Sequence, residues 1–338
     1  MPQQALTTVS LAAGVAAALD QVPAAAGVVQ LLGPEGRSLV LGIASNLRRW
    51  AGSRLGAGAA AASGRRPKTD LSGIATAVAW VLTRGPFHQR LTYERLMAPL
   101  VPVSARRDLK PPAFLHLDAG ERFPRLSVRG AEALGPHDFG PFRDRRTAEK
   151  ARDAVQRAFA LRPCDLVFEP DPAWAPGLAC LYAQVRSCAA PCLGRTDEAA
   201  YRRSAEQVAA WLSEPGARSE APAAVPGHVA AAIGSLALIV DAGRHEVGLF
   251  PVRDGRVLDD AAATATPETI ESAVAALGWP DSEGPADWPW LTSWLRGARA
   301  RACWLCLSPG EAAKALAARV RQVLAARGDK VGATRGST

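Results

Sequence analysis

The chain has 338 residues, of which 48% are hydrophobic, so it is long enough for two or three domains with buried cores. Its formal net charge of +8 favours a polyanionic partner, with DNA as the leading candidate. The alternative is that an arginine-rich protein carries such a charge for solubility alone. The six cysteines are clustered, which argues against a secreted disulfide framework, and no stretch has the apolar length of a membrane span. We therefore expect a cytoplasmic protein without membrane contact.

The first hundred residues predict a small sheet flanked by helices. Residues 5–19 are apolar but lack the basic start and cleavage site of a signal peptide, so we expect a helix there. Residues 27–32 and 38–41 are apolar runs joined by Gly-Pro-Glu-Gly, which predicts a hairpin. Further helices are predicted from apolar periodicity at residues 46–55, 71–82 and 91–100.

A second hairpin and a helix are predicted in the middle of the chain. Residues 114–117 and 125–128 flank the polar sequence Asp-Ala-Gly-Glu-Arg, which is typical of a turn between strands. Residues 147–161 place Ala148, Val155 and Phe159 on one face at helical spacing, and most arginines of this segment lie elsewhere on its surface.

Four cysteines follow that helix closely. Cys164, Cys180, Cys188 and Cys192 have the spacing C-x15-C-x7-C-x3-C. Soft sulfur ligands suit iron–sulfur clusters or zinc. Structural zinc sites usually have two tight C-x2-4-C pairs, and only one close pair is present here, so the spacing leans toward a cluster. Four buried thiols without a metal are the alternative, because free cysteine often packs as a small hydrophobic residue.

The C-terminal third predicts a separate small α/β domain. Residues 213–226 are rich in Pro, Ala, Ser and Glu, which is typical of a linker. Beyond it we predict a three-stranded meander, two short helices and a last helix that ends near residue 327. Cys303 and Cys306 form a C-x-x-C pair inside an apolar run, and packing in a core is favoured there over a redox or metal site.

Three motifs surround the four cysteines. They are Phe139-Gly-Pro-Phe142, Phe159-Ala-Leu-Arg-Pro-Cys164 and Cys180-Leu-Tyr-Ala-Gln-Val-Arg-Ser-Cys188-Ala-Ala-Pro-Cys192-Leu-Gly194. Tyr201 and Leu212 follow at the spacing Y-x10-L. Together the motifs resemble the cysteine-rich region of the UvrC family and its Cho-like relatives, the nuclease subunits of bacterial nucleotide excision repair. The resemblance covers roughly residues 120–215.

The resemblance implies a function in DNA repair and a cofactor. By analogy with the family, the four cysteines would hold a 4Fe-4S cluster, with zinc as the alternative. DNA is the partner that the family implies. The family's UvrB-binding helical hairpin would follow the cysteines, where this chain has its Pro/Ala-rich linker. A UvrB-type partner is therefore not predicted.

Residues 20–118 resemble a GIY-YIG nuclease domain that has lost its chemistry. The positions of the family's two motif tyrosines, its lysine and its arginine are taken by Val29, Val40, Ile43 and Trp50. Hydrolysis of a phosphodiester needs a proton acceptor and a cation at the phosphate, and these side chains supply neither. Glu94 falls near the family's metal-binding glutamate as a remnant. From the residues alone we favour a solvated helix carboxylate there.

Basic residues of the first two segments predict the DNA interface. We expect phosphate contacts from Arg48, Arg49, Arg143, Arg145 and Arg146, which lie on or next to predicted helices. Two alternatives stay open: an active structure-specific endonuclease with a divergent GIY-YIG site, and a non-catalytic interaction protein whose cysteines bind zinc or no metal.

The predicted fold class is α+β. A degenerate GIY-YIG-like sheet flanked by helices would be followed by a helical cysteine-cluster module and a small C-terminal α/β domain. The corresponding ranges are 1–118, 119–215 and 225–327, with a disordered tail at 328–338.

Overall fold

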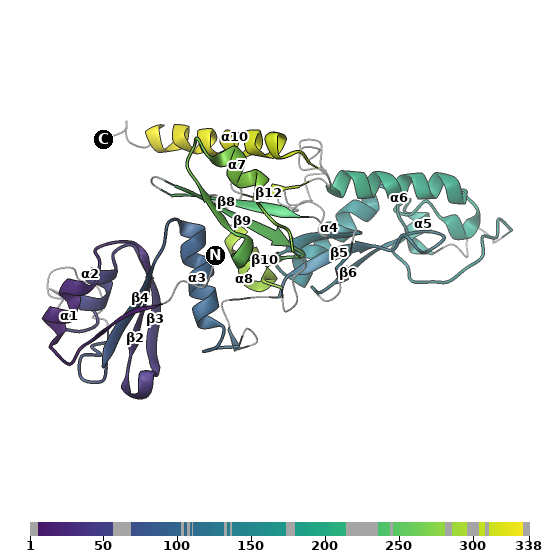
Figure 1. Ribbon diagram of the computed structural model, residues 1–338. Coiled ribbons are helices and arrows are strands. Elements are labelled where there is room, and N and C mark those ends of the chain that lie inside the picture. Colours follow the sequence, from purple (N-terminus) through teal and green to yellow (C-terminus); the bar gives the residue numbers. More distant parts are fainter. Residues whose placement is uncertain are drawn as a thin grey trace.

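The computed structural model describes residues 6–56, 69–102, 105–106, 109, 111–131, 134–135, 137–173, 180–213, 236–243, 246–280, 286–295, 304–307 and 311–333. Across these ranges the strands form three antiparallel sheets, with helices packed against each of them (Figure 1). The predicted α+β class is confirmed. No helix in the described part of the chain has both the length and the apolar character needed to cross a bilayer.

The first sheet has the strand order β1-β4-β2-β3. Its strands are β1 (Thr7–Ser10), β2 (Gly27–Leu32), β3 (Ser38–Ala44) and β4 (Ala77–Leu82). A turn η1 (Pro34–Gly36) joins β2 to β3, as the hairpin prediction has it. Helices α1 (Val15–Gln21) and α2 (Leu47–Gly52) share a core with one face of this sheet.

Two helix predictions in this segment are wrong. Residues 5–19 begin with strand β1, whose Thr-Thr-Val-Ser sequence pairs with β4, and only then enter α1. The run at 71–82 ends in β4, which lies between β1 and β2. Four consecutive residues of β4 are buried, because the strand has neighbours on both edges and packing on both faces. A continuous apolar run of that kind does not distinguish a strand from a buried helix.

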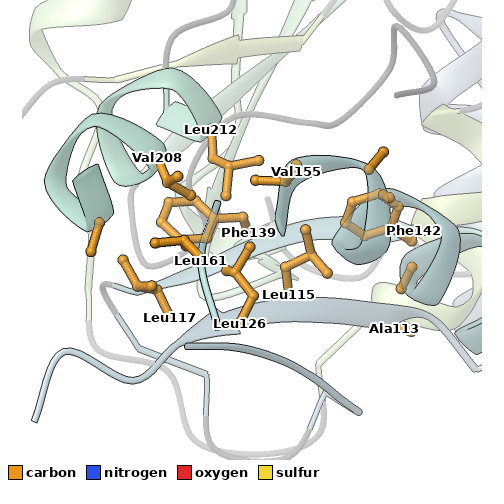
Figure 2. Close-up of a cluster of buried hydrophobic side chains, with 14 of the residues drawn as sticks. Ala113, Leu115, Leu117, Leu126, Phe139, Phe142, Val155, Leu161, Val208 and Leu212 are labelled. Atoms are coloured by element: carbon orange, nitrogen blue, oxygen red, sulfur yellow. The ribbon is translucent and has the colours of Figure 1, made fainter. Parts of the chain in front are cut away.

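The middle sheet holds β5 (Ala113–Leu117) between β6 (Leu126–Arg129) and β7 (Asp138–Phe142). The predicted hairpin of β5 and β6 is confirmed. Figure 2 shows the core between this sheet and two helices, α4 (Arg145–Ala158) and α6 (Glu198–Ser213), with Phe139, Val155 and Val208 meeting at its centre. The predicted boundary after residue 118 falls inside the hairpin, so the middle sheet begins before it.

The third sheet has the order β10-β9-β8-β12, with β11 on the other edge of β9. The strands are β8 (Ala237–Ala242), β9 (Val247–Arg253), β10 (Arg256–Val257), β11 (Ala263–Ala265) and β12 (Trp304–Cys306). The predicted meander of β8, β9 and β10 is confirmed. Helices α7 (Ile270–Ala275) and α10 (Ala313–Ala333) pack on one face, and α8 (Trp288–Leu295) packs on the other.

Helix α10 corrects the prediction for the C-terminal tail. It continues through Ala333, past residue 327 where we expected the last helix to end. Its alanine-rich sequence has a high intrinsic helix propensity. The predicted linker, apart from Ser213, lies outside the described residues.

Helix α3 (Pro86–Met97) joins the first sheet to the third. Phe87 and Leu91 pack into the core of the third sheet, while the Gln89 side chain donates to the carbonyl oxygens of Gly27 and Ala44 at 2.9 and 2.8 Å. Asp241 on β8 caps the helix by accepting the backbone N–H of Phe87 and His88 at 3.1 and 2.8 Å. The last part of the chain therefore lies between the first two (Figure 1).

Candidate metal centre and nucleic-acid interface

The four predicted cysteine ligands lie on irregular backbone beside the middle sheet. Cys164 belongs to the coil that follows α4, and Cys180 directly precedes the short helix α5 (Leu181–Gln184). Cys188 follows α5, and Cys192 lies in the 3-10 turn η4 (Pro191–Leu193). All four are free thiols. Cys188 is buried and Cys180 is exposed, so the group reaches from the core to the surface.

Electrostatic interactions place the four thiols near one another. The pKa of the Cys188 thiol is raised to about 11, mainly by burial and to a smaller extent by charge on Cys164, Cys180 and Cys192. The pKa of Cys192 is also raised by burial and by Cys180 and Cys164. Within the described residues, however, no three His, Cys, Asp or Glu side chains stand in positions that would hold a metal ion. The ligand set therefore stays a prediction.

Backbone amides face two of the sulfurs. The N–H of Ala190 donates to the sulfur of Cys188 at 3.3 Å, and the N–H groups of Cys192 and Leu193 lower the pKa of Cys192. Ala190 and Gly194 take left-handed conformations, with φ of 51° and 62°, which curl the chain tightly around Cys192. Amide donors stabilise thiolate charge, and four soft donors suit a thiolate-bound group. The four cysteine sulfurs are the donor type that an iron–sulfur cluster or zinc requires.

Sequence reasoning missed Arg162 as a part of this site. Its side chain is 7% exposed and bonds to the backbone of the Cys164 coil. A signal was present in the sequence, because a charged residue in the apolar run Phe159-Ala-Leu-Arg-Pro is unusual unless it is paired.

Three of the four positions that resemble the nuclease motif, Val29, Val40 and Trp50, pack in the core of the first sheet, whereas Ile43 is 40% exposed. Val29 is completely buried and faces Gly42 across the β2–β3 ladder, and Val40 lies in the same core. Trp50 on α2 covers Gly42 so closely that an added Cβ would lie 2.4 Å from the indole ring.

Glu94 corrects our expectation of a solvated carboxylate. It is 5% exposed, because α3 turns it inward. Arg90 pairs with its Oε1 at 2.6 Å, and Arg106, whose side chain is 8% exposed, pairs with its Oε2. Two guanidinium groups therefore occupy the carboxylate that resembled a metal ligand.

The predicted DNA contacts fall on two separate parts of the molecule. Arg48 and Arg49 are exposed on α2, but the guanidinium of Arg48 donates to the carbonyl oxygens of Val22 and Asp20 at 2.8 and 3.0 Å. Arg143, Arg145 and Arg146 are exposed at the start of α4, far from α2 (Figure 1). The structure therefore does not bring the five arginines together on one surface.

The remaining cysteine pair stays untested. Cys306 ends strand β12, which pairs with β8, and Cys303 lies outside the described residues.

Comparison with known proteins identifies the middle of the chain. Residues 113–211 match the family model described as UvrC/Cho excinuclease, middle domain. UvrABC system protein C of Paenarthrobacter aurescens (strain TC1) is 31% identical over 201 residues, which cover 57% of this chain and 28% of that protein. The corresponding protein of Saccharopolyspora erythraea is 33% identical over 191 residues, 55% of this chain and 26% of that protein. UvrABC system protein C of Aromatoleum aromaticum is 31% identical over 205 residues, 57% of this chain and 31% of that protein.

The chain thus spans less than a third of the length of these relatives. No solved structure matches it.

Proposed function

We propose that this UvrC-like chain, which carries a UvrC/Cho excinuclease middle domain, is a DNA-repair protein that binds DNA and holds a thiolate-bound iron–sulfur cluster. The observation that carries the proposal is the group of four neighbouring free thiols inside the matched segment. Bound there, a cluster would supply folding energy and an electron-transfer group. Zinc is the other metal that this donor set fits.

The DNA-binding part of the proposal rests on exposed arginines at the start of α4. Arg143 and Arg145 are 56% and 70% exposed, and their ion pairs with Asp144 and Glu149 are surface pairs that add little stability. They and Arg146 are therefore available to phosphates at low energetic cost. Arg49 is a further candidate on α2. Arg48 is a weaker one, because it already binds two carbonyl oxygens.

We also propose that the GIY-YIG-like segment does not cleave DNA. The buried Val29 cannot accept a proton, Trp50 covers Gly42, and two arginines occupy Glu94. The test is incubation of nicked, bulged and adducted duplexes with Mg²⁺ or Mn²⁺. Metal-dependent cleavage that disappears in Glu94→Gln would replace this proposal with a divergent active endonuclease.

Two measurements test the main proposal. Iron and acid-labile sulfide should be present in anaerobically purified protein, in amounts that account for one cluster per chain. Duplex affinity should fall steeply between 50 and 200 mM salt, as expected when about 6–10 phosphates are contacted. Replacing Arg143, Arg145 and Arg146 together by Gln should lower the salt slope by about 1 for each lost contact, whereas Arg319→Gln on α10 should not change it. Absence of binding at low salt would refute the DNA assignment.

An interaction protein is the second candidate. The observation that favours it is a set of exposed apolar side chains around the cysteines: Leu166, Val167, Leu181, Tyr182 and Val185. Exposed apolar groups gathered in one module are typical of protein-binding surfaces. This candidate predicts a chain without iron and without salt-dependent DNA affinity.

A further inference from the structure

Arg162 binds the coil that contains Cys164 to the segment between β5 and β6. Its Nε donates to the carbonyl oxygen of Phe123 at 2.8 Å. Its Nη1 donates to the carbonyl oxygens of Leu166 and Cys164 at 2.8 and 3.3 Å. Its Nη2 pairs with the carboxylate of Glu121 at 2.5 Å. One buried guanidinium therefore holds both sides of this contact.

The backbone around Arg162 is held by a second set of bonds. Its N–H donates to the hydroxyl of Tyr201 on α6 at 2.7 Å, and that hydroxyl donates to the carbonyl oxygen of Pro124 at 3.1 Å. Phe168 lies over the guanidinium at 5.4 Å and stacks on Phe123. Burial raises the pKa of Tyr201 above its usual range, so the hydroxyl stays protonated and remains a donor.

Cys164 depends on such contacts more than the other three cysteines do. Cys180, Cys188 and Cys192 lie within one short stretch that contains α5 and η4. Cys164 lies on residues 161–171, where the chain is neither helix nor strand. Two backbone bonds join the ends of this coil to the other cysteines, from Ala189 N–H to the Ala160 carbonyl at 2.8 Å and from Asp171 N–H to the Cys192 carbonyl at 3.0 Å. Between these ends the coil has no backbone ladder, so the side-chain bonds of Arg162 are what hold the backbone next to Cys164.

We propose that Arg162 is a positioning residue, which fixes Cys164 beside the other three cysteines; the inference rests on the proposed function of this site as a metal centre. The guanidinium offers donors in a rigid planar fork, and this geometry reaches three carbonyl oxygens and a carboxylate at once. A lysine has one ammonium at this place and spans fewer acceptors. The lysine variant therefore separates charge from geometry.

The experiment compares Arg162→Gln and Arg162→Lys with Arg122→Gln as the matched control. Arg122 is the neighbouring arginine of the same region and forms two ion pairs, with Glu169 and Glu198, but is half exposed. In reduced, metal-free protein, the alkylation rate of each cysteine is followed by mass spectrometry. Co²⁺ affinity is then measured from thiolate-to-cobalt charge-transfer absorption. Melting temperature and circular dichroism monitor folding.

Arg162→Gln should speed alkylation of Cys164 selectively and lower Co²⁺ affinity about 10–100-fold, the range typical of losing a group that orients a metal ligand. Arg162→Lys should fall between Gln and the unchanged protein, and Arg122→Gln should match the unchanged protein. In a Cys164→Ser background, Arg162→Gln should lower Co²⁺ affinity no further, because its effect acts through Cys164.

Two results would overturn the inference. One is a folded Arg162→Gln variant with unchanged Cys164 alkylation and unchanged Co²⁺ affinity. The other is equal acceleration at all four cysteines together with a lowered melting temperature, which would mark a general stabilising role. If the purified chain holds no iron but Arg162→Gln still exposes Cys164 selectively, the positioning role stands and the cluster proposal fails.

Discussion

Side chains at the family-motif positions are packed differently in two regions of the molecule. One region is the first sheet, with the positions that resemble the nuclease motif, and the other is the cysteine module beside the middle sheet. At the first, Val29, Val40 and Trp50 pack in a core that includes α1 and α2, and Ile43 is exposed. At the second, the motif cysteines remain as free thiols, with the apolar side chains of Leu181 and Val185 exposed beside them. The first set is mostly packed, whereas the cysteines range from buried Cys188 to exposed Cys180.

Backbone conformation shows the same contrast. Of the five described non-glycine residues with positive φ, three lie in the cysteine module, namely Ala160, Arg186 and Ala190, and Asp254 lies in the turn between β9 and β10. In the first sheet's region, Glu35 is the described example, and it lies in a hairpin turn. Such conformations cost about 1–3 kcal/mol each and persist where the surroundings require them. The cysteine module therefore concentrates left-handed backbone and unpacked thiols, a combination that is typical of functional sites.

The largest expected effect tests whether the cysteine module holds metal. Cys188→Ser should remove iron and sulfide completely and destabilise the module, because ligation contributes to folding energy. Cys303→Ser should retain both, since that cysteine belongs to the separate C-x-x-C pair. Metal and sulfide analysis of the two variants decides the matter. Full iron content in Cys188→Ser would remove the basis of the comparison.

The next effect tests whether Glu94 is structural. Glu94→Gln should lower the free energy of unfolding by about 3 kcal/mol, because breaking a buried ion pair removes the carboxylate that balances buried guanidinium charge. Glu149→Gln on the exposed surface of α4 should change it by less than about 0.5 kcal/mol. Urea unfolding measures both. If Glu94→Gln left the free energy of unfolding unchanged and abolished DNA cleavage, Glu94 would instead be a metal ligand.

A smaller effect sharpens the view of the first sheet as packed core. Gly42→Ala should cost about 1–3 kcal/mol, because the new methyl group meets the ring of Trp50. Trp50→Ala combined with Gly42→Ala should restore part of this loss relative to the sum of the two single changes. If the losses in free energy of unfolding of the two single variants add up in the double variant, the indole of Trp50 does not clash with the methyl group at position 42.

The smallest effect concerns the start of α4, where the predicted DNA contacts lie. Asp144 caps this helix by accepting the N–H and the hydroxyl of Thr147 at 2.9 and 2.7 Å. These bonds hold the pKa of the Asp144 carboxyl well below its usual range. Asp144→Ala should cost about 1 kcal/mol of unfolding free energy, and Asp144→Asn much less.

The pH dependence has a definite sign. Because the folded pKa is depressed, the cap's contribution is fully present above the unfolded value, near 3.8, and is lost as pH falls toward the folded pKa. The stability difference between the unchanged protein and Asp144→Ala should therefore shrink only in acid. A difference that shrinks with rising pH would contradict this assignment.

The sequence by itself determined the elements whose signals are local. The two hairpins, the meander and the cysteine-rich region follow from turn residues, alternation and motif spacing, which act over a few residues. The lack of acid–base or cationic groups at Val29, Val40 and Trp50 was also visible, since chemistry is a property of residue type.

The tertiary structure alone decided what the charged residues do and which segments share a core. Strand β4 was predicted as helix because burial on both faces erases periodicity. Arg106 pairs with Glu94, twelve positions away along the chain. Asp241 of the third sheet caps α3, and Arg162 contacts Glu121 and Phe123 about forty residues away in sequence. Ion pairs and capping bonds depend on distances in space. Those distances are set when the core folds, so separation along the chain does not reveal which side chains will meet.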